Sequence, residues 1–178
     1  MANVQLSNHA VTQKWREHWA RRIISHLQVI PFLRMPDVAN QTTDQHAWYA
    51  FVMQFDASQA PADLSRDKFV KLLTDKGLSE VDIPRSTGLL NSLPLFTETA
   101  KALPRFGTPG PWGKPQDTSE FPRALAFYNS AIKLPMWSRG QDEAIVDRYI
   151  NGFVETAHEQ LHGTSFRAPR RNTIQARL

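Results

Sequence analysis

The fold is decided by the stretch Trp48-Tyr49-Ala50-Phe51-Val52-Met53-Gln54-Phe55, which is the strongest strand pattern in the chain. Aromatic and β-branched residues dominate it, and such residues favour a pleated, half-buried surface. Large side chains occupy alternate positions, namely Tyr49, Phe51, Met53 and Phe55, so one face of the strand is expected to be uniformly bulky. The stretch therefore predicts a central strand that is covered on at least one side.

A long helical pattern precedes this strand. Its apolar residues recur every fourth position, which places them on one stripe of an amphipathic helix. The stripe consists of Val11, Trp15, Trp19, Ile23 and Leu27. Pro31 follows, and the residue before a proline is biased away from helix, so the pattern predicts a helix over Thr12–Gln28.

The remaining elements follow from shorter signals. Ser65 as N-cap and Gly77 as stop bound a predicted helix over Arg66–Lys76, and the alternation in Leu78–Ile83 predicts a half-buried strand. An irregular, Gly- and Pro-rich loop comes next, with a short helix over Leu95–Leu103. The last predicted elements are a helix over Phe121–Ala131, a short strand or extended segment over Ile132–Trp137, and a helix that opens at Ser138 or Gly140 and closes at Gly163.

This order predicts an α+β fold. We expect a small, roughly three-stranded, mostly antiparallel sheet with helices packed on one face, preceded by a long N-terminal helix. The predicted division is an N-terminal extension over residues 1–9, one domain over residues 10–162, and a basic flexible tail over residues 163–178.

Composition narrows the class of protein. The chain has 178 residues, 41% hydrophobic, and no cysteine, which excludes disulfides and thiolate metal sites. The net charge of +4 comes from four arginines in the last sixteen residues, so residues 1–162 are formally neutral and nucleic acid is not an expected partner. Since neither a targeting segment nor a long apolar run is evident, we expect a cytoplasmic protein with no membrane contact.

Several short motifs occur in a fixed order. They are the helix Thr12–Gln28 with its Ile30-Pro31 exit, His46–Val52, Arg66-Asp67-Lys68-Phe69, Gly77-Leu78, Pro94-Leu95-Phe96, Phe121-Pro122, Ile132–Pro135 and Asp142–Asp147. This series resembles the C-terminal small domain of the DegT/DnrJ/EryC1/StrS family of pyridoxal phosphate-dependent sugar aminotransferases. Within that family, the loop and the Leu-Pro-Met-Trp segment are more similar to the amino-cyclitol enzymes.

The resemblance implies a partner. Family members hold pyridoxal phosphate in a large N-terminal domain, which supplies the Schiff-base lysine and the phosphate contacts. No lysine of this chain stands in the Ser-x-x-x-Lys-like context that the family uses, and no Gly-rich phosphate cradle occurs. We therefore expect no cofactor on this chain alone, and pyridoxal phosphate only when it is paired with an aminotransferase large domain. Self-association is the other expected partnership, and a small polar sugar or cyclitol is the expected substrate.

The variable loop carries the candidate substrate-binding residues. They are Arg85, Ser86, Thr87, Asn91, Arg105 and Trp112. Arginine donors with neighbouring hydroxyls suit phosphate or polyol oxygens, although Arg85 alternatively ties the loop to Asp82 or Glu80. Those two carboxylates form either a pair on one strand face or a solvated edge. We assign no catalytic residue and no metal site, and interpret His158 and His162 as cations that favour a helix C-terminus.

Three functions remain open from the sequence. The first is a partial or split aminotransferase, whose small domain completes a substrate cleft on a separate cofactor-binding domain. It predicts an exposed apolar docking face that includes Trp15 and Trp19. The alternatives are a non-catalytic binding or scaffold module, and a lone domain repurposed for chemistry without a cofactor.

Overall fold

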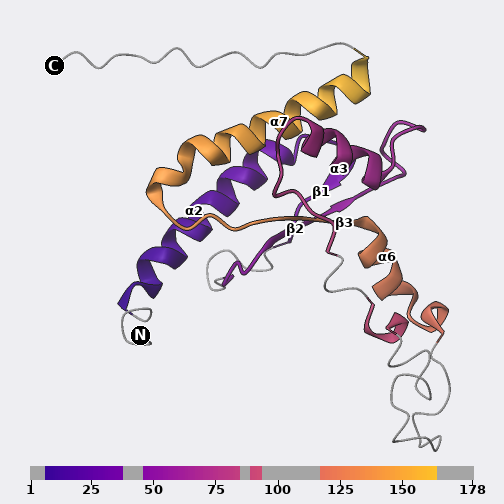
Figure 1. Cartoon of the computed structure of the whole chain (residues 1–178), viewed down its shortest axis with the longest axis horizontal. Coiled ribbons are helices and arrows are strands. Elements are labelled where there is room, and N and C mark those ends of the chain that lie inside the picture. The colour runs from indigo at the N-terminus through magenta and orange to yellow at the C-terminus, as the bar shows by residue number, and fades with distance from the viewer. Residues whose placement is uncertain (1–6, 38–45, 85–88, 94–116, 164–178) are drawn as a thin grey trace, which may run out of the picture.

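The computed structural model describes residues 7–37, 46–84, 89–93 and 117–163 (Figure 1). Ten helices, helical turns and strands follow one another along these residues. In chain order they are α2 (His9–Leu27), β1 (Leu33–Arg34), β2 (Phe51–Phe55), α3 (Arg66–Asp75), the 3₁₀ turns η1 (Leu90–Ser92) and η3 (Thr118–Glu120), α6 (Pro122–Ser130), β3 (Ala131–Leu134), the 3₁₀ turn η4 (Gly140–Asp142) and α7 (Glu143–His162). The predicted helix over Leu95–Leu103 lies outside the described residues.

The sheet has three strands in the order β1-β2-β3, and both pairings are antiparallel. Leu33 pairs with Phe55 at one edge, and Phe51 pairs with Leu134 at the other. The predicted α+β class, the antiparallel sheet and the central position of β2 are confirmed. Among the described helices, none is both long and apolar enough to cross a membrane.

Helices cover the face of β2 that carries Phe51, Met53 and Phe55, all of which are buried. Helix α7 lies alongside both α2 and α3 (Figure 1). The centroid of the Phe69 ring of α3 lies 6.2 Å from that of Phe55 and 5.8 Å from that of Phe153 of α7. These three aromatic rings therefore connect the sheet with both helices. Burial of these rings supplies the main stabilisation of the layer.

Helix ends form where the sequence places caps. The Ser65 hydroxyl accepts a hydrogen bond from the Lys68 amide at 3.2 Å and caps α3. Gly77 and Gly163 adopt left-handed conformations, with φ of 84° and 65°, and end α3 and α7. All three predicted end signals are confirmed.

Trp15 and Trp19 join α2 to the start of α7. Trp19 is buried and its indole N–H donates to the Arg139 carbonyl at 2.9 Å. The Trp15 ring stacks on Trp19 and comes so close to Gly140 that a Cβ there would lie 2.7 Å from it. The expectation that Trp19 belongs to an exposed docking face is therefore wrong, because the ring is buried against the start of α7. Trp15 is half-buried and packs against Gly140 of η4.

The prediction that Tyr49 shares the core-facing side of the strand with Phe51 is wrong. The strand begins at Phe51, and Tyr49 is 95% exposed, whereas Trp48 is buried at 6%. Trp48 has φ of 46°, a left-handed conformation that interrupts the extended backbone. Side chains alternate only along an extended chain, so this one residue turns Tyr49 away from the core.

Two further strand predictions need correction. Leu78–Ile83 forms a turn, in which the Val81 amide donates to the Leu78 carbonyl at 3.2 Å, followed by a single bridge between Asp82 and Lys133. Leu78 and Val81 are buried at a spacing of three, which fits a turn, whereas Val81 and Ile83 are buried on either side of the exposed, bridged Asp82, as the predicted alternation requires. The third strand is instead β1, which sequence analysis missed. The short strand predicted after α6 is present as β3, which ends at Leu134, before Pro135. The division into extension, domain and tail stays a prediction.

Candidate functional site

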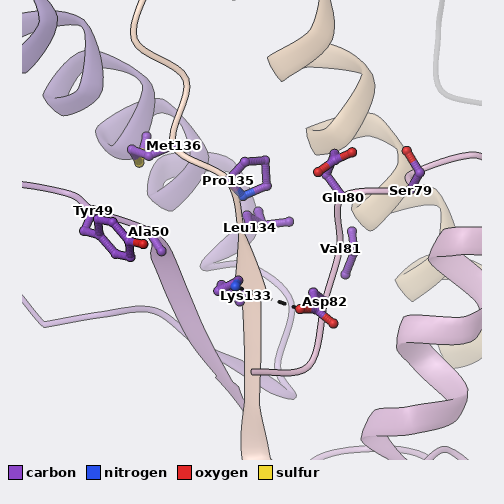
Figure 2. A pocket seen from close by; sticks show the side chains of 10 residues that line it. All are labelled: Tyr49, Ala50, Ser79, Glu80, Val81, Asp82, Lys133, Leu134, Pro135 and Met136. Atoms are coloured by element: carbon purple, nitrogen blue, oxygen red, sulfur yellow. Dashed lines mark ion pairs between the residues drawn. The ribbon is translucent and has the colours of Figure 1, made fainter. Parts of the chain in front are cut away.

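A hollow of about 510 Å³ opens beside the C-terminal end of β3 (Figure 2). It is bounded by three segments: the entry to β2, the turn after α3, and β3 with its exit. The lining residues are Tyr49, Ala50, Ser79, Glu80, Val81, Asp82, Lys133, Leu134, Pro135 and Met136. Such concave surfaces with a few convergent polar groups are the usual places for small-molecule binding.

The floor of the hollow is held by a backbone bridge. The Asp82 amide donates to the Lys133 carbonyl at 3.0 Å, and the Lys133 amide donates to the Asp82 carbonyl at 2.7 Å. Their side chains form an ion pair, with 3.9 Å between Nζ and Oδ2. The pair is partly solvated, so it contributes little to stability, but it fixes a cation and an anion side by side on the floor.

The segment that carries Glu80 is held in place by a hydrogen bond to α7. The Glu80 amide donates to the hydroxyl of Tyr149 at 3.0 Å, and Tyr149 is itself buried against Trp137. This bond fixes the backbone and leaves the Glu80 side chain exposed at the hollow. No described residue forms an ion pair with its carboxylate.

The hollow's polar groups are mixed in kind and negative in sum. Lys133 supplies an ammonium group, Tyr49 and Ser79 supply hydroxyls, and Glu80 and Asp82 supply carboxylates. One positive and two negative side chains give a formal charge of −1. This set both donates and accepts hydrogen bonds, which suits a ligand with several hydroxyl groups.

The predicted substrate-binding residues are not tested by this geometry. Arg85, Ser86, Thr87, Arg105 and Trp112 lie outside the described residues, as does the side chain of Asn91, whose backbone belongs to η1. In the sequence, the predicted loop begins at Arg85, directly after the buried Pro84 and three residues after Asp82, which forms part of the hollow.

Sequence analysis found part of the hollow and missed the rest. Glu80 and Asp82 both line it, and Asp82 forms an ion pair with Lys133. The alternative contact of Arg85 with Asp82 or Glu80 stays a prediction, because Arg85 lies outside the described residues. Lys133 and Tyr49 were missed. Lys133 is the one polar residue within the apolar run of β3, and that position was the available signal.

The histidines do not add a metal site within the described segments. The rings of His158 and His162 lie 4.6 Å apart at the C-terminal end of α7, as their spacing requires. No group of three or more potential metal ligands occurs among the described residues.

Comparison with known proteins gave matches among solved structures only. No family model matches the chain, and neither does any curated protein sequence. DesV of S. venezuelae, solved in complex with a ketimine intermediate, superposes with a TM-score of 0.59 at 19% identity over 87% of this chain and 34% of its own. A candidate sugar aminotransferase, Spr1654 of Streptococcus pneumoniae, gives 0.59 at 20% identity over 89% and 34%.

An aminotransferase from Psychrobacter cryohalolentis superposes with a TM-score of 0.58 at 16% identity, over 88% of this chain and 38% of its own. The fold is that of part of an aminotransferase. At these identities the likeness shows shared architecture and does not by itself carry activity across. The chain spans about a third of the length of the first of these proteins, so the activity of a complete enzyme belongs to the proposal below.

Proposed function

We propose that this chain is the small domain of a pyridoxal phosphate-dependent aminotransferase that acts on sugars or cyclitols. It completes a substrate cleft on a cofactor-binding domain that is not contained in residues 1–178. The observation that carries this proposal is the match of nearly the whole chain to about a third of several aminotransferases. The ordered motifs from the linking helix to Asp142–Asp147 support it independently.

The side chains at the hollow do not fit pyridoxal phosphate. The cofactor needs an amine for its aldehyde, an acid for its ring nitrogen and a cluster of donors for its phosphate. Lys133 is the lysine that lines the hollow, but the neighbouring Glu80 and Asp82 repel a phosphate group, and Asp82 already neutralises the lysine. The other described lysines of α3 and its C-terminus, Lys68, Lys71 and Lys76, are in surface ion pairs.

The proposed contribution of this chain is therefore substrate binding. The backbone bridge between Asp82 and Lys133 fixes the segment that precedes Arg85, Ser86 and Thr87 in the sequence, and we assign these three to substrate contact. Asn91, Arg105 and Trp112 complete the proposed set. Pyridoxal phosphate held by the partner domain would supply the chemistry of amino transfer.

The test is reconstitution in the native host. The chain is tagged, its complex is purified, and amino transfer to a keto sugar or keto cyclitol is measured. We expect activity that disappears when the chain is dissociated and returns when it is added back. Arg85→Ala should lower activity in the reassembled complex, and Arg34→Ala, at an exposed site on β1, should not. Unchanged host transaminase activity after deletion of the chain contradicts the proposal.

A second function, a self-associating scaffold module, is favoured by helix α6. None of its residues is buried, and Phe127 and the preceding Phe121 are exposed. Helix α6 lies apart from α2 and α7 (Figure 1). A helix this short needs packing partners for stability. Sedimentation of the isolated chain separates the two functions: a dimer lost on Phe127→Ser supports the scaffold, whereas a monomer supports the split enzyme.

A further inference from the structure

Trp48 holds a backbone conformation that is rare for a bulky residue. Its φ of 46° lies in the left-handed region, which normally selects Gly or Asn. The surrounding structure holds it there, because the indole N–H donates to the Glu17 carboxylate of α2 at 2.5 Å and the ring stacks on Phe51 with 5.7 Å between centroids. Observed strain of this kind is a reason to ask what it positions.

The residue that Trp48 positions is Tyr49. In a continuous strand Tyr49 shares the core-facing side with Phe51, but here it stands at the rim of the hollow with 95% of its surface exposed. Figure 2 shows Tyr49 and Glu80 on opposite sides of β3, with Leu134 and Pro135 between them and the Lys133–Asp82 pair below them in this view. The hollow therefore has an aromatic ring at one rim, a carboxylate at the other, and both apolar and charged residues between them.

The charges decide which ligand this arrangement accepts. Among the described lining residues, Lys133 is paired with Asp82 at 3.9 Å, and the Glu80 carboxylate is the remaining charge. A phosphorylated ligand is repelled by that charge, and an apolar ligand leaves the charged groups without hydrogen bonds. Ring hydroxyls satisfy both donors and acceptors, and an ammonium substituent pairs with Glu80.

We infer that the hollow is a subsite for a polyhydroxylated ring that is uncharged or carries an amine, and that Tyr49 determines its specificity by covering one face of the ring. This inference rests on the proposed function, since it specifies which part of the substrate the small domain contacts. It adds Tyr49 and Glu80 to the residues of the predicted loop. It also assigns any phosphate group of the substrate to a place other than this hollow.

The test compares three forms of one ring on the full 178-residue chain: glucose, glucosamine and glucose 6-phosphate. Binding is followed by amide NMR shifts. We expect saturable shifts at Ala50, Glu80–Asp82 and Lys133–Leu134, with glucosamine bound about fivefold more tightly than glucose and glucose 6-phosphate most weakly. Tyr49→Ala should weaken all ring binding, and Glu80→Gln should abolish the preference for glucosamine.

Val29→Ala is the matched control, because Val29 is also exposed but does not line the hollow. Tightest binding of glucose 6-phosphate, shifts confined to other segments, or no saturable shift with any ring overturns the inference. The proposed function is judged separately by amino transfer in the native complex. An active complex whose small domain binds no ring at the hollow removes the inference and leaves the function standing, and ring binding without amino transfer does the reverse.

Discussion

Thr156 lies fully buried in α7, and its hydroxyl oxygen forms no hydrogen bond within the described residues. A buried hydroxyl without a partner costs about 1–3 kcal/mol. Thr156→Val keeps the shape and removes the polar group, so we expect the free energy of unfolding to rise by about 1 kcal/mol. Urea denaturation measures it. Thr74→Val is the control, because the Thr74 hydroxyl donates to the Lys71 carbonyl at 2.8 Å, and this substitution should give no gain.

Two glycines separate backbone strain from crowding. Both Gly77 and Gly163 have positive φ, so an alanine at either site costs about 1–2 kcal/mol. A Cβ at Gly77 would also lie 2.7 Å from the Arg148 guanidinium, which donates to the Gly77 carbonyl, whereas nothing lies within 4 Å of a Cβ at Gly163. Thermal unfolding should therefore show the larger loss for Gly77→Ala. Equal losses contradict the crowding argument.

At the residue scale, what sequence analysis found and missed has one physical cause. Ser65, Gly77 and Gly163 were found because their local chemistry dictates the conformation they adopt. Trp48 was missed because a tryptophan has no intrinsic preference for positive φ. Tertiary contacts with Glu17 and Phe51 impose that conformation, and Tyr49 was misplaced as a result.

Arg22 joins two elements that are far apart in the chain. From α2 it contacts Glu143 at 3.0 Å and Asp147 at 2.6 Å on α7, and only 19% of its side chain is exposed. We expect Arg22→Met to lower the free energy of unfolding by about 1 kcal/mol and to reduce its dependence on salt. Lys71→Met is the matched comparison. Lys71 forms an exposed pair with Asp75 within one helix, and it should matter much less.

The junction of β1 and β2 gives a pH dependence. Hydrogen bonds to the Asp56 carboxylate lower its pKa from the ordinary value of an aspartate. The bond from the Ser58 hydroxyl has the largest effect, and the bond from Arg34 of β1 is the second. A lowered folded-state pKa stabilises the fold at neutral pH, and this contribution is lost as the pH falls through the folded-state value. In Asp56→Asn, the free energy of unfolding should therefore fall less steeply below about pH 4. Urea midpoints measured across this pH range test it. If the variant loses stability toward acid pH as steeply as the wild type does, this role of Asp56 is wrong.

Element length explains which elements were predictable. The helices α2, α3 and α7 span several turns, so their apolar periods are repeated often enough to be recognised. Strand β1 has two residues, and the turn at Leu78–Val81 alternates over too few positions to be told from a strand. These short elements were therefore predicted less well than the long helices.

At the scale of the whole molecule, the fold corresponds to about a third of several aminotransferases, and the hollow lies open at the end of its sheet. Sequence analysis identified the carboxylates of this hollow, Glu80 and Asp82, as a candidate pair. Their arrangement with Lys133 and Tyr49 depends on the Asp82–Lys133 bridge. That pairing joins residues far apart in the chain, and no local pattern specifies it. The fold's class follows from the helices and from β2 alone.

The central claim is that this chain binds substrate and leaves the cofactor to a partner domain. The isolated chain is mixed with an equal amount of pyridoxal phosphate, reduced with borohydride, and analysed by mass spectrometry of its peptides, with Lys133→Arg alongside. The account predicts scattered traces of modified surface lysines, and the same pattern in the variant. One phosphopyridoxyl group per chain on a single lysine, lost in Lys133→Arg or held at any other position, contradicts it.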